Sequence, residues 1–222
     1  PELSACRGVE QKGFHRFDVL DHLLLALDAS EPSLALRLAA LLHDTGKPEA
    51  KAVGDDGIPT FYRHEEISAR IGTRTLKRLR FPNEVIDAVE HLVLHHMFHY
   101  EDSWTDAAVR RFLARVGKEK LGDLLSLRLA DSAALAGNPP DPRDLDPLRK
   151  RVDDQLSRDM ALGIKDLSIG GNELAALGIP RGPVMGRVLV ELLEAVLDDP
   201  GLNTRERLSD IALRLKPKHG IG

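Results

Sequence analysis

The stretch LRLAALLHDTGKPEA, residues 36–50, places two ionisable side chains directly at the end of an apolar run. Apolar residues occupy nearly every face of this run up to Leu42, which is typical of a central, buried helix. Gly46 and Pro48 follow and predict that the helix stops there. His43 and Asp44 are therefore expected to be buried, and a buried charge is costly unless it is paired or bound to a metal.

The composition bounds the class of protein. With 222 residues, the chain forms one large domain or two small ones. Its 42% hydrophobic and 30% charged residues suit a soluble globular protein, and its single cysteine, Cys6, excludes an internal disulfide framework and a cysteine-rich zinc site. No apolar run has the length of a membrane span and no leader opens the chain, so a cytoplasmic protein without membrane contact is expected. The net charge of −4 provides no overall attraction to nucleic acid.

Helical periodicity extends over most of the chain, so the predicted fold is all-α: a helical bundle followed by a smaller helical tail region. A short hairpin is expected around Asp56-Gly57, and the proline-rich stretch 137–147 is the clearest linker. It separates a predicted domain 1–140 from a predicted tail domain 148–222. The expected helices are 19–29 (capped by Asp18), 34–44, 62–79, 84–98, 106–117, 119–137, 148–161 and one near 204–214.

Several helices carry a histidine or aspartate toward one interior. His64 shares a face with Ile67 and Ile71, and Asp131 follows Leu124 and Leu127 at helical offsets. His96 lies near the apolar stripe of its helix, whereas His95 points roughly 120° away at about 100° per residue. The full ordered set is His22, His43, Asp44, His64, His96 and Asp131. Imidazoles and carboxylates from separate helices predict a metal site without cysteine, suited to one or two ions of Mn, Fe, Ni, Co or Mg.

A single histidine near an apolar face is more often a hydrogen-bonded core residue than a ligand. We therefore assign His91 and His99 to the surface or rim and His219 to the tail, while His15 belongs either to a loop or to the edge of the site. Only the ordered set, with each element on its own helix, favours a metal.

The order His…His-Asp…Asp, with its second element reading HDTGKP, resembles the HD superfamily of metal-dependent phosphohydrolases. The resemblance implies an all-helical domain whose metal is held by His22, His43, Asp44 and Asp131. His64 in RHEEISA and His96 in LVLHHM resemble the ligands of the subset that binds a second metal, and in some of these relatives both histidines of such a pair, here His95 and His96, are ligands. Lys47 resembles the lysine that approaches the substrate phosphate in some members.

Two longer segments narrow the resemblance. GVEQKGFHRFDVLDHLLLALD near the start and DLSIGGNELAALGIPRGPVMGRVLVELLEAV near the end resemble the carboxy-terminal portion of bacterial CCA-adding and poly(A) polymerase-type tRNA nucleotidyltransferases. The catalytic head of that family needs a Gly-Ser pair followed by Asp-x-Asp on a sheet. Here Asp144 and Asp146 lie in the proline-rich linker without such a pair. Either a fused catalytic domain is missing from this chain, or the chain is a headless HD protein. A polynucleotide kinase fusion is a third possible parent, although no GxxxxGK[ST] loop is present.

The resulting prediction is a metal-dependent phosphohydrolase that acts on nucleotide or RNA-end phosphoesters such as 2′,3′-cyclic phosphates. Asp44 and Lys47 are the predicted catalytic residues, and Lys47, Arg74 and Arg78 are the predicted phosphate contacts. The alternative is an RNA-binding body of a tRNA nucleotidyltransferase without its head, in contact with tRNA or another RNA.

The tail motif GIPRGPVMGRVL leaves two interpretations open. Its glycines, Gly178, Gly182 and Gly186, either turn a helix–loop–helix and allow close packing, or they present backbone N–H groups to an RNA phosphate beside Arg181 and Arg187.

Overall fold

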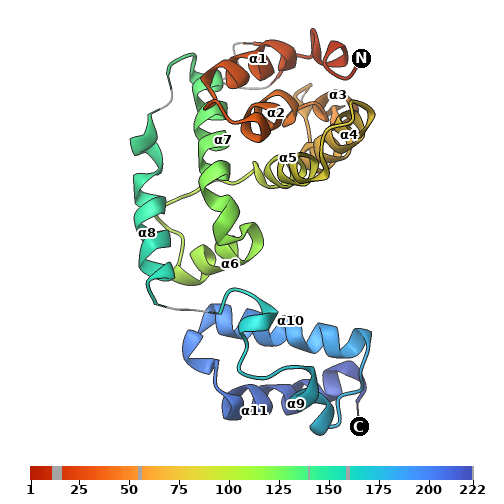
Figure 1. The fold of residues 1–222 in the computed structure, drawn as a ribbon, viewed down its shortest axis with the longest axis vertical. Coiled ribbons are helices and arrows are strands. Elements are labelled where there is room, and N and C mark those ends of the chain that lie inside the picture. Colours follow the sequence, from red (N-terminus) through yellow and green to blue (C-terminus); the bar gives the residue numbers. More distant parts are fainter. Residues whose placement is uncertain (12–16, 55–56, 140, 159–160, 222) are drawn as a thin grey trace. The chain divides into compact units, whose positions relative to one another are not determined.

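The computed structural model describes residues 1–11, 17–54, 57–139, 141–158 and 161–221. The protein is all-α, as predicted, with one two-stranded sheet in the described part of the chain. The chain divides into two compact units (Figure 1). Unit 1 comprises Pro1–His99 and Glu119–Asp146, and unit 2 comprises Tyr100–Lys118 and Pro147–Gly222. None of the described helices is long and apolar enough to cross a membrane.

Unit 1 is a helical bundle in which α1 packs against α2, and α5 packs against both α2 and α4. The loop after α3 contains the expected hairpin, an antiparallel pair of short strands, although Asp56 itself lies outside the described residues. The elements are η1 (Ser4–Cys6), α1 (Val19–Ala29), α2 (Leu34–Leu42), α3 (Lys47–Ala50), β1 (Ala52–Val53), β2 (Pro59–Thr60), α4 (His64–Arg78), α5 (Asn83–His95), α7 (Lys118–Ala136) and η2 (Pro142–Leu145).

Local sequence signals explain how the helices of unit 1 begin. Asp18 caps α1, because its Oδ1 accepts a hydrogen bond from the backbone N–H of Asp21 at 2.8 Å. The interior of the unit is built from aliphatic side chains, as the shortage of aromatic residues requires; Leu23, Ala39, Val89, Leu124 and Leu127 are fully buried or nearly so. These residues lie on α1, α2, α5 and α7, and Leu23 belongs to a small cluster with Cys6 and Val19.

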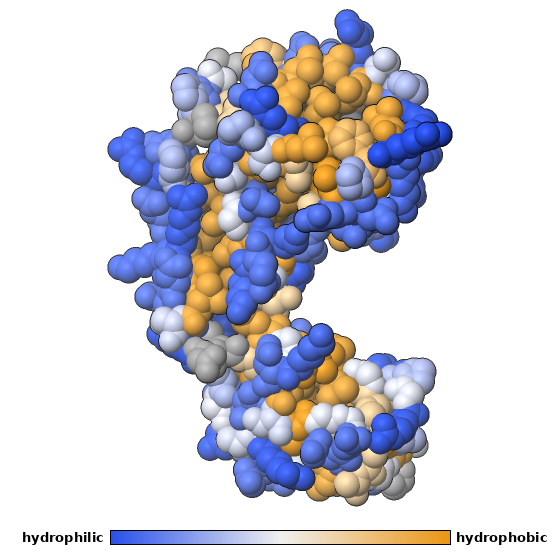
Figure 2. All heavy atoms as spheres, in the orientation of Figure 1, coloured by the Kyte–Doolittle hydropathy of each residue, from blue (hydrophilic) through white to orange (hydrophobic). Residues whose placement is uncertain are grey.

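Unit 2 contains a second core, in which Leu174, Val188, Leu192, Leu208 and Ala212 are buried. Its helices are α6 (Asp106–Val116), α8 (Asp146–Leu156), α9 (Gly171–Ala176), α10 (Pro183–Asp198) and α11 (Arg205–Leu215), with short 3-10 turns at Ile164–Asp166, Pro200–Leu202 and Pro217–His219. Helix α8 is amphipathic: Leu148 and Val152 are buried, while hydrophilic side chains follow its outer side (Figure 2).

One buried arginine explains why α6 belongs to unit 2. Arg110 is only 6% exposed; its Nε donates to the carbonyl of Leu197 at 2.6 Å and its Nη2 to that of Asp198 at 2.8 Å. Its Nη1 donates to Oε1 of Gln155 at 3.0 Å. The structure thus groups residues 100–118 with the C-terminal segment, whereas the predicted division into 1–140 and 148–222 placed them with the first domain.

Candidate metal centre

The end of α2 is where the apolar stretch meets its two ionisable residues. His43 is the C-cap of α2, and His43 and Asp44 are 1% and 2% exposed. The ring Nδ1 of His43 lies 2.8 Å from the carbonyl oxygen of Ala40, one of the last carbonyls of the helix. Burial of Leu36, Ala39 and Leu42 on the helix pulls this polar end into the interior of unit 1.

His64 and His96 repeat the local arrangement of His43. Nδ1 of His64 lies 2.8 Å from the carbonyl oxygen of Phe61, and Nδ1 of His96 lies 2.7 Å from that of Val93. A carbonyl only accepts hydrogen bonds, so each Nδ1 carries the proton. In the neutral ring, each Nε2 then keeps a lone pair for the interior, which is the form of histidine that binds metals.

Asp44 lies between two groups of imidazoles. Its Oδ2 is 3.3 Å from Nε2 of His43 and 3.6 Å from Nε2 of His22. Its Oδ1 is 3.0 Å from Nε2 of His64 and 3.7 Å from Nε2 of His96. One carboxylate thus offers a separate oxygen to each group.

Asp131 of α7 completes the first group. Its Oδ1 lies 3.0 Å from Nε2 of His22 and 3.5 Å from Nε2 of His43. Ligand atoms of His22, His43 and Asp131, and likewise those of His43, Asp44 and His96, lie close enough together to share an ion. The structure therefore brings together the whole predicted ordered set.

The donor set fits a cation. Asp44 Oδ1 and His64 Nε2 are buried and 3.0 Å apart, yet they form no hydrogen bond. Because Nδ1 of His64 already carries the ring proton of the neutral imidazole, both facing atoms are acceptors, and two buried acceptors face each other favourably only around a cation or a proton. The residues present thus suit a divalent ion held by imidazole and carboxylate.

Burial and the close pairing of imidazoles with carboxylates both shift the pKa values of the centre. Burial alone would lower the pKa of His43, but the carboxylates of Asp44 and Asp131 outweigh it and raise this pKa to about 10. Burial would raise the pKa of Asp131, but hydrogen bonds from His22 and His43 hold it well below its usual range. For Asp44, burial is likewise outweighed, here by His43 and Lys47, and the pKa lies well below its usual range. Burial lowers the pKa of His96.

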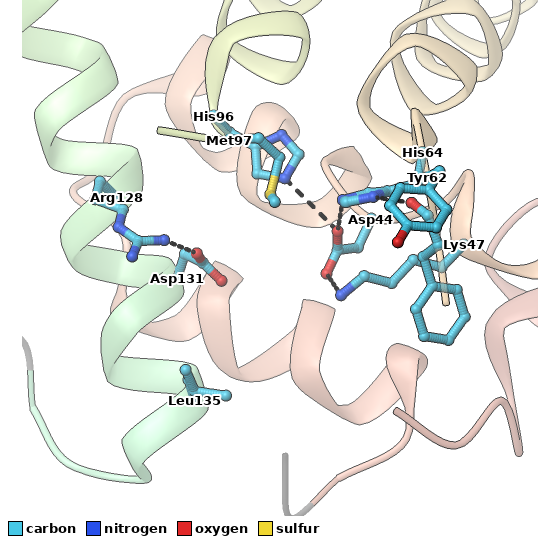
Figure 3. Close-up of a pocket in the computed structure, with 10 residues that line it drawn as sticks. Asp44, Lys47, Tyr62, His64, His96, Met97, Arg128, Asp131 and Leu135 are labelled. Carbon is cyan, nitrogen blue, oxygen red and sulfur yellow. Dashed lines mark hydrogen bonds and ion pairs between the residues drawn. The ribbon is translucent and has the colours of Figure 1, made fainter. Parts of the chain in front are cut away.

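A pocket of about 380 Å³ opens onto the centre (Figure 3). Lys47 is a buried lining residue, with Nζ 2.6 Å from Asp44 Oδ2 and 2.5 Å from Gln11 Oε1. On the α7 side, Nη1 of Arg128 donates to Asp131 Oδ2 at 3.0 Å. The pocket is lined by Asp44, Lys47, Phe61, Tyr62, His64, His96, Met97, Arg128, Asp131 and Leu135.

Other predicted site residues lie elsewhere. His95 packs edge to face against His91, with ring centroids 4.5 Å apart, and is not among the residues that line the pocket. Arg78 forms a two-pronged ion pair with Glu2, at 2.6 and 2.9 Å, and Arg74 lines two other surface depressions of unit 1. His219 of the tail pairs with Glu191 at 2.9 Å. His15 lies outside the described residues.

The sequence interpretation missed Arg128, Tyr62 and Met97. Arg128 precedes Asp131 by three residues on one helix, a spacing that places the two side chains side by side and was available as a signal. Tyr62 lies two residues before His64 and Met97 one residue after His96, so both adjoin metal-ligand candidates in a way that periodicity alone does not reveal.

The tail glycines have separate roles in the structure. Gly178 and Gly182 have φ angles of +79° and +122°, which side chains rarely adopt, so the turn between α9 and α10 requires them. A Cβ at Gly186 would meet open space, so this residue serves no close packing. Arg181 donates to Oδ1 of Asn172 at 2.9 Å.

Comparison with known proteins places these observations in a family. A family model described as the HD domain matches residues 15–146. Over 88% of its length, the chain is 37% identical to the A-adding tRNA nucleotidyltransferase of Deinococcus radiodurans and covers 46% of that protein. Over 88% of its length it is also 35% identical to the CC-adding tRNA nucleotidyltransferase of Thermus thermophilus and covers 44% of it. A multifunctional CCA protein of Methylobacillus flagellatus is 33% identical over 62% of the chain. The chain spans about half the length of the first two relatives.

Proposed function

The chain belongs to the HD-domain family, and we propose that it is a metal-dependent phosphohydrolase acting on nucleotide or RNA-end phosphoesters such as 2′,3′-cyclic phosphates. One observation carries the proposal: the two oxygens of Asp44 face two separate groups of buried imidazoles. A module that only holds RNA has no chemical need for such a ligand set.

The proposed ligands divide according to the oxygens of Asp44. His22, His43 and Asp131 would hold one ion with Oδ2, and His64 and His96 would hold a second with Oδ1. Imidazole with carboxylate suits Mn, Fe, Ni or Co, and Mg is acceptable where oxygen ligands dominate. A divalent ion bound there supplies Lewis acidity, because it polarises a phosphoryl oxygen and lowers the pKa of water.

The chain's own side chains provide the remaining chemistry. Lys47 and Arg128 line the pocket from opposite sides, and each is within hydrogen-bond distance of a carboxylate of the centre. Their positive charges can balance the negative charge that builds up on the phosphoryl oxygens in the transition state. Asp44 is the acceptor that orients the attacking water. Arg74 and Arg78 remain proposed phosphate contacts for a substrate long enough to leave the pocket.

The test combines metal analysis with an activity screen. Elemental analysis of the protein would be followed by hydrolysis of 2′,3′-cyclic AMP and bis(4-nitrophenyl) phosphate with Mn, Ni, Co and Mg. We expect activity in the wild type, loss of at least about 100-fold in Asp44→Ala, and full retention in Asp123→Ala, an exposed residue of α7. Metal-loaded wild-type protein that cleaves neither ester would contradict the proposal.

A second candidate function rests on the relatives. Their names describe tRNA nucleotidyltransferases, and the chain spans about half of their length. The candidate is the RNA-holding body of such an enzyme. Binding of tRNA by both the wild type and Asp44→Ala, without ester hydrolysis by either, would favour it over the phosphohydrolase.

A further inference from the structure

The pocket above the metal centre has two chemically different parts. Its floor is charged and is formed by the ligand candidates together with Lys47 and Arg128. Its mouth carries apolar and aromatic side chains: Phe61 and Tyr62 precede α4, Met97 follows α5 and Leu135 lies on α7. Figure 3 shows Tyr62 beside His64 and Met97 beside His96, with Arg128, Asp131 and Leu135 facing them from α7. A substrate that consisted of a phosphate alone would bind to the charged floor and would not require the apolar mouth.

Tyr62 is exposed at the mouth although burial would stabilise it. The residue is 80% exposed, and it makes no ring contact within the described part of the chain. An aromatic side chain left in water at a pocket mouth offers a large surface for a ligand at low entropic cost, because only two torsions become ordered.

The turn that holds Tyr62 is the turn that orients a ligand candidate. The carbonyl of Phe61 accepts the hydrogen bond from Nδ1 of His64 at 2.8 Å. Arg63 between them has a left-handed φ of 58° and is held by two hydrogen bonds to Glu66, at 2.9 and 2.6 Å. A non-glycine residue in this region is strained and persists where the surroundings require it. The strain thus serves a turn that directs His64 inward and Tyr62 outward.

Met97 stands in a similar position on α5. It follows His96 directly and is 58% exposed, while His96 is 2% exposed. A thioether is polarisable and adapts its shape, and it packs favourably against aromatic rings. Two ligand candidates on different helices therefore each have an exposed neighbour that lines the same pocket.

We propose that Tyr62 and Met97 form a subsite for the base of the nucleotide whose phosphate lies at the metal centre. This inference rests on the proposed phosphohydrolase function and adds the part of the substrate that is recognised. Every base has a π face, so Tyr62 could stack on any of the bases. Such stacking would favour a terminal, unstacked nucleotide over a phosphoester without a base.

The experiment compares two substrates with the same reacting group. Both 2′,3′-cyclic AMP and glycerol 1,2-cyclic phosphate contain a five-membered cyclic phosphodiester, but only the first has a base. In Tyr62→Ala, the ratio of kcat/KM for the nucleotide to that for the glycerol ester should fall about 10- to 100-fold. Tyr62→Phe should restore most of the ratio because it keeps the ring. Leu79→Ala, an exposed apolar residue at the C-terminal end of α4, should leave both rates unchanged.

An unchanged ratio in Tyr62→Ala would overturn the subsite, even if both rates fell together. Metal analysis of each variant would show whether such a joint fall reflects a damaged centre.

Calorimetric binding of adenosine 2′-monophosphate and glycerol 2-phosphate separates this inference from the proposed function. If the wild type hydrolyses neither cyclic ester, the phosphohydrolase proposal fails. A preference for the nucleotide that disappears in Tyr62→Ala and returns in Tyr62→Phe would still support the subsite. Equal affinity of the wild type for the two phosphates would overturn it.

Discussion

Asp44 faces both imidazole groups, because each of its oxygens lies beside one group. The residues of the two groups can be substituted separately. His64 faces only Oδ1, whereas His22 and Asp131 belong to the other group.

His64→Ala tests whether the two groups bind ions separately. We expect wild-type protein to bind two equivalents of Mn²⁺ and the variant to bind one, because His22, His43 and Asp131 remain intact. Calorimetric titration of metal-free protein measures the stoichiometry, with His99→Ala, exposed beyond α5, as the control. Loss of both equivalents in His64→Ala would show that the two groups do not bind ions independently.

Cys6 provides a prediction about pH. Burial, and then the charges of Asp44 and Asp18, raise the pKa of its thiol to about 11. Two units above the ordinary pKa leave roughly 100-fold less thiolate at pH 8, so native protein should react with a disulfide reagent at least about 100-fold more slowly than denatured protein. Equal rates in the two states would refute the buried position of Cys6.

The raised pKa of Cys6 also makes the free energy of unfolding depend on pH. The folded state keeps the thiol protonated, while the unfolded chain ionises above its ordinary pKa of 9.0. The unfolded state therefore binds fewer protons between pH 9 and about 11, and the free energy of unfolding falls as pH rises through that window. The slope should be weaker in Cys6→Ala, measured by chemical unfolding at several pH values.

Residue types and order were enough to identify the ligand candidates, because each of them lies on or next to a helix whose apolar face is readable. Arg128 and Tyr62 were not identified, since an arginine on a helix and a tyrosine in a loop are individually ordinary. Their significance depends on which pocket they line.

Among the elements, the turn between α2 and α3 depends on Gly46. The sequence interpretation gave this glycine the role of ending the helix, yet its φ of −82° is available to every residue. The structural reason is space: a Cβ would lie 2.5 Å from the carbonyl oxygen of His64 and 2.6 Å from the backbone nitrogen of Ser68. The backbone N–H of Gly46 also donates to Oγ of Ser68 at 2.8 Å.

Gly46→Ala should therefore destabilise the protein by about 1–3 kcal/mol, because backbone atoms must shift to make room. This movement would displace the backbone of His64, a ligand candidate, so the affinity for Mn²⁺ should fall as well. Gly122→Ala is the matched control: its Cβ meets open space within α7, and removing a helical glycine should stabilise by about 0.5–1 kcal/mol. Equal effects of the two substitutions in urea unfolding would contradict the close approach.

Local sequence signals predicted most of the helices. They predicted the ends of the helices less accurately. The range of α1 matches its prediction because Asp18 caps it. Helix α5 ends at His95, three residues before the predicted end, because His96 caps it through its own ring. The hydrophobic periodicity classifies His96 only as a polar residue, so it does not predict this capping interaction.

For the molecule as a whole, the division into units could not be read from the linker alone. The run RRFLARVGKEK, residues 110–120, has the charge pattern of a solvated helix face, yet Arg110 is buried and contacts a segment more than eighty residues later. Nothing in the local sequence distinguishes Arg110 from Arg111, which remains 40% exposed and pairs with Glu194 at 2.8 Å. Two of the three partners of Arg110 are backbone carbonyls, which any sequence supplies.

Arg110→Met should lower the free energy of unfolding of unit 2 by about 1–3 kcal/mol, because the carbonyls of the last two residues of α10 lose their donor. Arg111→Met should cost less than about 1 kcal/mol, as is usual for exposed ion pairs. Trp104, the single tryptophan of the chain, lies in unit 2 and reports its unfolding by fluorescence. Mn²⁺ stoichiometry should be unchanged in both variants; its loss in Arg110→Met would show that the units are not energetically separate.

The helix caps at His43 and His96 have a consequence for the electric field at the centre. The peptide dipoles of a helix sum to partial negative charge at its C-terminal end and partial positive charge at its N-terminal end. Helices α2 and α5 bring their negative ends to the ligands, and α4, which begins at His64, brings its positive end. The backbone itself therefore favours a cation beside α2 and α5 and an anion toward the start of α4, so a metal and a phosphate would be held in a set order even before any side chain is charged.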